Sequence, residues 1–581
     1  MRRPFALLAL LLLPACGLPL TEGVQPAGQV EAAREEPAPV RVIPPGPQPG
    51  ASPQDIVRGF LNAQSSPDDG HAVARTFLAP GTTWDDEQGA VVYRARGFVE
   101  GTGQDPLTFT VRFDTTARIH PTGAFVLDDA PVPATYVVGR MPSGEYRLTS
   151  VPAGLHLTGK ARERSFRPYD VHFLARALDG EATGRLVPDR VFLPETAARA
   201  SALVGALVGG ATPPLRPAVT SALPAGTGLA SPVVERDGVV TVDLTGEVEA
   251  LGARGRQRLS AQFAWTLVPA FQGVRLLVEG RPFQVEGAGE VQSRKDWPEY
   301  HPAGVDPQAP LYYVQGRKLR SLDGPLPESE ATGPGPLPVD AVAVSPAGGA
   351  LGLLSRVADD LDEVRTGPPE GPFGSPVLRR PGLGSLSWGP GDQGLWLVAD
   401  GARPAVCLLA PVGRPPRADP CAVPYEQPTG AGPLSGLRVS RDGARIALVF
   451  GTGTARRLYV GRIEPGPAGP RIDVAAGPVA RLLTDVTDVA WQSGTTLAVL
   501  ASSGGSQVVL WNVTVDGSAG PTVVQRPGLS GDAVKVAAAA GRPLVVGALV
   551  DGQPRLFRDT GTLFREVPGG GEAGSAPAYP G

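Results

Sequence analysis

The sequence predicts a multidomain fold: an α+β N-terminal domain, a second α+β domain and an all-β C-terminal propeller of five or six blades. Three observations lead to this prediction. The chain has 581 residues, which is enough for several domains. Runs with helical and with strand periodicity follow one another in its first half. From Leu311 onward, short apolar strands and glycine turns recur at a regular interval, which is typical of propeller blades.

The first residues, 1–15, have the pattern of a lipoprotein signal peptide. A basic pair after Met1 is followed by the apolar run 5–13, which is too short to span a bilayer. The next residues resemble a lipobox, so we expect a signal peptidase to cleave between Ala15 and Cys16. The Cys16 thiol would then carry a diacylglycerol, with acyl chains such as palmitate, and hold the protein on the extracytoplasmic face of the cell membrane. The alternative is an ordinary signal peptide with an incidental cysteine.

Composition limits what the rest of the chain does. Residues 16–52 are rich in Pro, Ala, Gly and Glu, which predicts an extended tether rather than a packed segment. No later apolar run reaches the length of a membrane span. The formal net charge is -4 and no stripe of Lys and Arg is present, so binding to nucleic acid is not expected.

Residues 53–166 are predicted to form the first domain. Ser52 precedes Pro53 and the acid Asp55, which is the pattern of a helix start, and apolar residues then recur on one helical face. A second short helix is expected at 71–78. Two helices followed by strands indicate a small α+β domain. The expected strands are 90–99, 107–119, 135–140 and 146–157.

Residues 167–285 are predicted to form the second domain. An Asp237-Gly238 turn within an apolar stretch predicts a tight hairpin. We interpret the order of elements as one compact sheet with helices on one face, followed by a packed connector at 286–310. The other expected elements are strands at 169–174, 186–193 and 274–278 and helices at 196–209 and 254–268.

Four segments of this second domain look similar to a GerMN domain, a module known from spore-germination proteins. The most specific are Leu223-Pro224-Ala225-Gly226-Thr227 and the later Val240-Thr241-Val242-Asp243-Leu244. The other two are Arg167–Leu174 and Gly184–Pro188. This resemblance implies a GerMN-like α+β fold for the domain.

Residues 311–567 carry the propeller repeat. Each unit is an apolar strand, a glycine turn and a second apolar strand, and the units lie roughly 40 to 50 residues apart. The turn glycines are Gly348, Gly391, Gly443, Gly494 and Gly541. A β-sandwich with coincidental spacing is the alternative. Residues 568–581 are expected to form a flexible tail.

The order of these parts is itself informative. A lipobox, a helix-first domain, a GerMN-like domain and a C-terminal propeller together resemble the LpqB-type lipoproteins of actinobacteria. The resemblance covers nearly the whole chain after Cys16. It implies an accessory, regulatory partner of the sensor histidine kinase MtrB in the MtrA/MtrB two-component system, which would bind the kinase through its extracytoplasmic domain.

No catalytic constellation stands out in the sequence. The five histidines are scattered and lack metal-ligand spacing. Residues 154–161 imitate a phosphate-binding loop, but Ala161 lacks the hydroxyl that would hold Mg²⁺, and we expect strand rather than helix around it. The acidic clusters 85–87, 359–363 and 485–488 are interpreted as solvated loops. We therefore expect no enzyme activity, no cofactor and no metal.

Three classes of function remain open at this stage. The first is an interaction protein that binds the outer domain of a membrane partner. The second is a lipoprotein that binds cell-wall glycan or a small ligand, with aromatic and acidic side chains converging at the propeller mouth. The third is an envelope hydrolase, which would need a buried carboxylate pair or a metal cluster at that mouth.

The two cysteines that remain after Cys16 form an even pair in an oxidising compartment. Cys407 lies in a strand-like run, and a loop rich in Pro and Arg leads from it to Cys421. We predict a disulfide between them, which would close a loop of about 15 residues. Two buried free thiols are the alternative.

Overall fold

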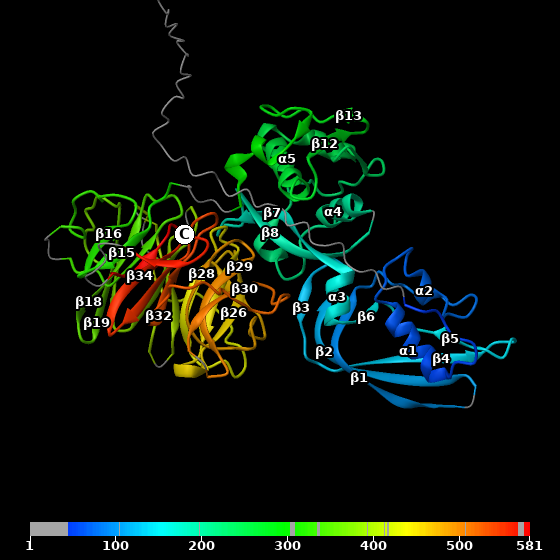
Figure 1. Cartoon of the computed structure of the whole chain (residues 1–581). Helices are drawn as coiled ribbons and strands as arrows, with labels where there is room; N and C mark the ends of the chain where they lie inside the picture. Colours follow the sequence, from blue (N-terminus) through cyan, green and yellow to red (C-terminus); the bar gives the residue numbers. More distant parts are fainter. Residues whose placement is uncertain are drawn as a thin grey trace, which may run out of the picture. The chain divides into compact units, whose positions relative to one another are not determined.

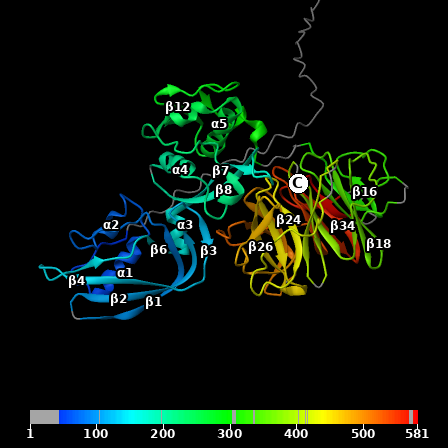
Figure 2. The ribbon, with the colours of Figure 1, turned by 180° about the vertical axis from the view of Figure 1, so that it is seen from behind.

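The computed structural model describes residues 44–581, apart from residues 104, 197, 303–307, 334–336, 392, 402, 412, 415–416, 506 and 568–573. Along the chain they form an α+β domain, a second α+β domain and a β-propeller (Figure 1), and Figure 2 shows the same elements from behind. The predicted multidomain fold class is thus confirmed. The predicted signal peptide and most of the predicted tether lie outside the described residues.

The first domain is a sheet that curves around helix α1, Pro53–Ala63 (Figure 1). Ser52 caps this helix as expected, because its Oγ accepts the backbone N–H of Asp55 at 3.2 Å. The helix buries Ile56 and Phe60, and it contacts β4 and β5. The sheet order is β5-β4-β2-β1-β6, with β3 beside β2. The remaining elements are α2 (Ala72–Arg75), β1 (Ala90–Thr102), β2 (Leu107–Ile119), β3 (Phe125–Leu127), β4 (Val132–Arg140), β5 (Tyr146–Ser150) and β6 (Leu155–Thr158).

Helix α3 (Gly159–Ser165) corrects the expectation of strand around residues 154–161. Strand β6 ends at Thr158, whose Oγ1 accepts the N–H of Ala161 at 3.3 Å and so caps the new helix. The helix has only seven residues. It was missed because a segment of this length, made mostly of polar and charged residues, shows no apolar periodicity.

The second domain contains two sheets where one was predicted. Strands β7 and β8 pair along most of their length as a long hairpin, with β9 beside β7. The outer edge of β8 meets the first domain instead of the second sheet, through a bridge between Ala124 and Val191. The second sheet has the order β10-β11-β12-β13, with β14 beside β12. Helices α4 and α5 share one apolar core with both sheets.

The predicted hairpin of this domain is confirmed. Asp237 and Gly238 connect β10 to β11 with φ angles of 52° and 75°, the left-handed backbone that a tight two-residue turn requires. The elements are β7 (Phe166–Arg176), β8 (Ala182–Pro194), α4 (Arg199–Val208), η1 (Arg216–Ala218), β9 (Val219–Thr220), β10 (Val234–Arg236), β11 (Val239–Leu244), η2 (Gly246–Ala250), α5 (Ala253–Leu267), β12 (Gly273–Val278), β13 (Arg281–Pro282) and β14 (Val291–Gln292).

The described part of the connector packs against the second domain. It contains β14 and two short 3-10 helices, η3 (Arg294–Asp296) and η4 (Pro298–Tyr300). Trp297 is buried, and its carbonyl accepts the Nε1–H of Trp265 at 3.1 Å. The connector is therefore attached to helix α5.

The propeller has six sheets among the described residues, whereas the glycine turns indicate only five. Five sheets are each formed by one continuous segment, in the orders β17-β18-β19-β20, β21-β22-β23, β24-β25-β26-β27, β28-β29-β30-β31 and β32-β33-β34-β35. The sixth sheet, β16-β15-β36, joins the two ends of the propeller. It lacks the repeat because its strands come from opposite ends of the domain.

The strands of the propeller follow in chain order. They are β15 (Tyr312–Gln315), β16 (Lys318–Ser321), β17 (Ala341–Val344), β18 (Leu351–Ala358), β19 (Leu361–Gly367), β20 (Leu378–Arg380), β21 (Leu383–Trp388), β22 (Leu395–Ala399), β23 (Ala405–Leu409), β24 (Leu434–Val439), β25 (Arg445–Phe450), β26 (Arg457–Glu464), β27 (Arg471–Val474), β28 (Leu483–Trp491), β29 (Thr496–Ser503), β30 (Val509–Thr514), β31 (Thr522–Val523), β32 (Asp532–Ala537), β33 (Val545–Val550), β34 (Gln553–Asp559), β35 (Phe564–Glu566) and β36 (Gly574–Ala578). A 3-10 turn, η5 (Gly453–Ala455), precedes β26.

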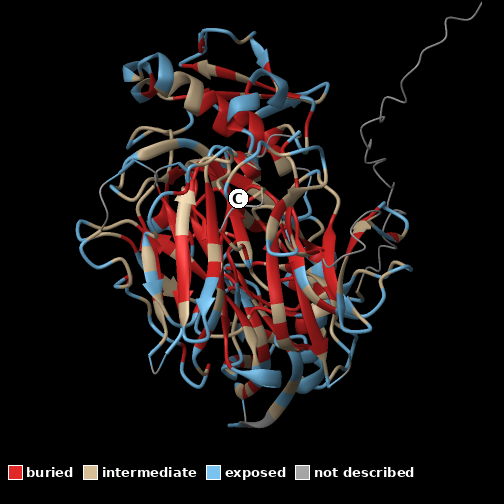
Figure 3. Cartoon of the chain, turned by 90° about the vertical axis from the view of Figure 1, so that its left-hand side faces the viewer, coloured by how far each residue is buried: buried red, intermediate tan, exposed pale blue. Residues whose placement is uncertain are grey.

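The C-terminal residues correct the predicted flexible tail. Strand β36 pairs antiparallel with β15, Tyr579 is buried, and the N–H of Gly581 donates to the carbonyl of Val344 at 2.9 Å. Joining the two ends of the domain in one sheet closes the ring of blades. Buried residues follow the propeller strands, and exposed residues gather in the connecting turns (Figure 3).

Candidate functional site

The predicted anchor residues, Ala15 and Cys16, lie outside the described residues, so the lipobox stays a prediction. Within residues 44–581 and their stated gaps, we find no helix with the length and apolar character of a membrane span. The two predicted disulfide cysteines and two of the three acidic clusters lie in the propeller, and the cluster 85–87 lies in the first domain.

Cys407 and Cys421 form a disulfide, the pairing that the sequence predicts. Cys407 is buried in β23, the outer strand of its sheet. The segment around Cys421 runs beside that strand, because Val423 forms a bridge with Val406 and Pro420 accepts the N–H of Leu408 at 2.7 Å. The disulfide therefore holds this segment where the three-stranded sheet lacks a fourth strand.

Two of the acidic clusters contain carboxylates that link neighbouring blades. Asp362 is buried in β19 and accepts the N–H of Leu383, in the next sheet, at 3.0 Å. Asp488 is buried in β28 and accepts from Arg438 at 3.1 Å and from the N–H of Val536 at 3.0 Å, on the sheets to either side. The interpretation of these clusters as solvated loops is wrong for both residues. The strand pattern could not predict these hydrogen bonds between blades, because the partners of each carboxylate come from other repeats.

Arg441 occupies the central channel of the propeller. It lies in the turn between β24 and β25, and its guanidinium donates to the carbonyls of Trp491 at 2.6 Å, Ala538 at 2.6 Å and Pro580 at 3.0 Å. Burial lowers the pKa of Arg441 to about 10, so the side chain stays charged at neutral pH. One cation thus connects the blades of β28 and β32 with the end of the chain.

The channel does not have the size of a ligand site. The cavity beside Arg441 has a volume of about 60 Å³, whereas small-molecule sites occupy about 300 to 1,000 Å³. The side chains described around it include no Asp or Glu. Two aromatic residues, Trp491 and Tyr579, line the cavity, but both are buried and no acidic side chain accompanies them there. Trp388 and Trp396 are buried within the blades. The converging aromatic and acidic side chains expected for a glycan site are not present at this channel, among the residues that the structure places there.

The two α+β domains contact the propeller directly. Arg445 donates from Nη2 to the carbonyl of Pro188 in β8 at 2.8 Å, and Arg190 donates from Nη2 to Oγ1 of Thr495 at 2.9 Å. Both propeller residues lie beside glycine turns of the repeat. The first domain contributes an ion pair between Asp129 and Arg481 at 2.6 Å.

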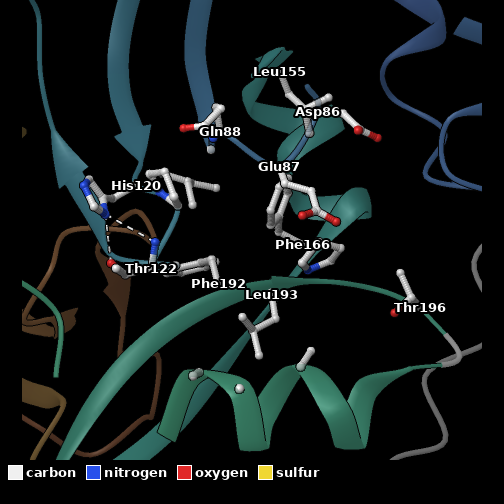
Figure 4. A pocket seen from close by; sticks show the side chains of 18 of the residues that line it. Asp86, Glu87, Gln88, His120, Thr122, Leu155, Phe166, Phe192, Leu193 and Thr196 are labelled. Carbon is white, nitrogen blue, oxygen red and sulfur yellow. Dashed lines mark hydrogen bonds between the residues drawn. The ribbon is translucent and has the colours of Figure 1, made fainter. Parts of the chain in front are cut away.

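A second cavity, of about 750 Å³, lies between the first domain and helix α4 (Figure 4). Its floor includes Phe166 and Phe192, which are both buried. Asp86 and Glu87 line it on the side of the first domain, and α4 contributes only glycine and alanine. Its volume lies within the range of small-molecule sites.

Three of the described histidines, His71, His156 and His172, are buried, and His120 is exposed. No group of His, Cys, Asp and Glu side chains in the described chain is arranged to hold a metal ion. Burial lowers the pKa of His156 and of His172 to about 4, so both rings are neutral at pH 7. His156 stacks on Phe113 with ring centroids 4.4 Å apart.

Sequence reasoning missed the 750 Å³ cavity and the role of Arg441. The cavity combines segments that are far apart in the sequence, so no local pattern marks it. The sequence does contain a pattern that could have indicated Arg441. Arg441 lies in a glycine turn, at the position where two other repeats have Pro346 and Pro390. In the structure, this one charged residue is buried between the blades.

Three family models match the chain in sequence order. The model described as Lipoprotein LpqB, N-terminal domain, matches residues 46–162, and the one described as Sporulation and spore germination matches 171–284. The model described as Lipoprotein LpqB beta-propeller domain matches 310–580. The chain belongs to the LpqB family. The predicted resemblance to this family, including the GerMN-like domain, is thereby confirmed.

Relatives in the LpqB family match the chain over most of its length. Lipoprotein LpqB of Thermobifida fusca is 29% identical over 568 residues, which is 88% of each chain. Lipoprotein LpqB of Rhodococcus opacus is 26% identical over 573 residues, covering 92% of this chain and 91% of the relative. Among solved structures, TolB from Acinetobacter baumannii is 13% identical with a TM-score of 0.34, over 47% of this chain and 66% of that chain. We infer nothing about function from that likeness.

Proposed function

We propose that this LpqB-family chain is a lipid-anchored lipoprotein on the extracytoplasmic face of the cell membrane. There it acts, without enzyme activity of its own, as an accessory partner of an MtrB-like sensor histidine kinase in a two-component system. The observation that carries the proposal is that three family models match in order, two of them described as parts of lipoprotein LpqB, and that relatives named Lipoprotein LpqB match most of the chain. Lipid on Cys16 would keep the protein close to a kinase in the same membrane.

The chemistry of the described propeller supports a binding role. Asp362 and Asp488 are used in links between blades, and Arg441 fills the channel. Groups that are buried and fully engaged in this way hold the propeller together and are not poised to react with a substrate. A partner would therefore bind an outer surface of the second domain or of the propeller.

Exposed apolar residues provide positions at which to probe that surface. Leu229 and Val234 are exposed on the second domain, and Val357 and Val377 are exposed on the propeller. Single exposed apolar residues are common on protein surfaces, so they serve here as probe positions. A charge introduced at an exposed position changes stability little but disturbs a partner that covers it.

A crosslinking pull-down from intact membranes tests the proposal. The tagged full chain should recover the kinase, and a chain lacking both 169–285 and 311–581 should not. Leu229→Asp with Val234→Asp is compared with the matched pair Val357→Asp and Val377→Asp. We expect one pair to lower kinase recovery at least about fivefold while the other leaves it unchanged. Kinase recovery that survives deletion of both domains contradicts the proposal.

A further inference from the structure

The cavity beside helix α4 is formed by several segments that are far apart in the sequence. The loop before α2, the turn before β1 and the turn after β2 contribute one side, β6 and the junction of α3 with β7 contribute the floor, and the end of β8 with α4 closes the other side. Its volume of about 750 Å³ is suited to a small molecule. Sites of this kind are common where two domains meet.

The floor of the cavity is apolar and held in place from behind. Phe192 is 2% exposed, with its ring centroid 5.4 Å from that of Phe125 and the guanidinium carbon of Arg162 5.4 Å from its centre. Phe166 and Leu155 are buried beside it. Side chains fixed in this way form a preorganised surface, which favours a ligand with a hydrocarbon or aromatic body.

The charges around the cavity are negative. The lining includes the carboxylates of Asp86 and Glu87 and the imidazoles of His71 and His120, but no lysine or arginine, although the chain has 53 of these basic residues. Asp86 is already paired with Arg75, at 2.8 Å. Among the described residues, the Glu87 carboxylate has no ion-pair partner, and it points into the cavity beside Phe166 (Figure 4). One uncompensated carboxylate over an apolar floor favours a ligand with a single positive charge.

The α4 wall leaves room for such a ligand to approach the helix backbone. The residues that face the cavity are Ala202, Gly205, Ala206 and Gly209. Gly205 lies inside the helix, where glycine is less favourable than alanine. Apart from its chain neighbours and the adjacent backbone of α4, no heavy atom of the chain would lie within 4 Å of a Cβ at Gly205, so packing against other parts of the chain does not require glycine there. The missing side chain enlarges the cavity instead.

We propose that this cavity is a binding site for a small organic cation, an amine or guanidine attached to an apolar body. The Glu87 carboxylate would accept hydrogen bonds from the cationic group, and Phe166 and Phe192 would contact the body. The site goes beyond the partnership with a kinase and does not depend on it, since its ligand would bind the isolated protein.

Three probes with one body and different charges test the proposal. They are 4-phenylbutylamine, 4-phenylbutanol and 4-phenylbutyrate, titrated by calorimetry into the lipid-free chain that begins after the tether. We expect the amine to bind with a dissociation constant of about 1 mM or tighter. The alcohol should bind at least about tenfold more weakly, and the acid should not bind. No measurable binding of the amine, or equal binding of amine and acid, overturns the proposal.

Variants locate the binding in this cavity. Gly205→Leu should keep the fold, because its side chain extends into open space, and it should abolish binding of the amine. Glu87→Gln should weaken binding of the amine at least about tenfold and leave that of the alcohol unchanged. Ala253→Leu, at an exposed position of helix α5 outside the cavity, is the matched control and should bind normally. Unchanged affinity for the amine in folded Gly205→Leu overturns the proposal.

Discussion

Replacing Arg441 with methionine is expected to destabilise the propeller by about 3 to 5 kcal/mol. The guanidinium donates to three carbonyls, at 2.6, 2.6 and 3.0 Å, which belong to Trp491, Ala538 and Pro580. Each buried carbonyl that loses its donor costs about 1 to 3 kcal/mol. Water that enters the cavity of about 60 Å³ recovers part of this cost. Methionine has a comparable length, so the change removes donors more than volume.

Thermal unfolding of the full chain, followed by tryptophan fluorescence, measures the effect. For a domain of this size about 2 to 4 °C is lost per kcal/mol, so the propeller transition should move down by about 10 °C. The propeller transition of Arg441→Lys should occur at a temperature between those of the unchanged chain and of Arg441→Met, because one ammonium does not reach three carbonyls with the geometry of a guanidinium. Arg565→Met, at an exposed position of β35, is the control and should change stability by less than about 0.5 kcal/mol. A shift below about 2 °C for Arg441→Met would refute the structural role given to Arg441.

Three further predictions concern the anchor, the disulfide and acid stability. Cys16→Ala should leave the protein unlipidated and soluble or unprocessed; a variant that still partitions with membranes at the same mass is incompatible with the lipobox. Replacing both Cys407 and Cys421 with serine should lower the unfolding free energy by about 3 kcal/mol, and alkylation of both thiols in unreduced, normally exported protein would rule the disulfide out. His156 and His172 are held neutral with a pKa of about 4, so the unfolded state binds protons that the folded state does not as the pH falls from about 6.5 to about 4. Each histidine should therefore lower the unfolding free energy by up to about 3 kcal/mol as the pH falls from about 6.5 to about 4, and should have no effect above that range. His156→Asn should make the unfolding free energy measured in urea depend less on pH, and an unchanged dependence argues against a buried, neutral His156.

Features determined by neighbouring residues could be predicted from the sequence. The cap at Ser52 and the turn at Asp237-Gly238 each follow from a few adjacent residues whose backbone preferences are strong. The propeller itself could be predicted because its repeat places similar strands at similar intervals. Helix α3 was missed because its seven residues are too few to show a period.

Features that depend on contacts between distant segments could not be predicted. The sixth sheet pairs Tyr312 with Ala578, and no local pattern connects two strands from opposite ends of a domain. The division of the second domain into two sheets depends on β8 meeting Ala124 of the first domain. The α4 cavity likewise joins Glu87 to residues of α4, which come together only in the folded chain.

The most direct test of the proposed function is a binding measurement between two purified proteins. The lipid-free chain that begins after the tether is immobilised, and the extracytoplasmic domain of an MtrB-like sensor kinase from the same cell is passed over it in biolayer interferometry. We expect saturable binding with a dissociation constant of about 10 μM or tighter. This binding should be lost with one of the two surface pairs, Leu229→Asp with Val234→Asp or Val357→Asp with Val377→Asp. The absence of saturable binding by folded proteins at concentrations up to about 100 μM would contradict the proposed function.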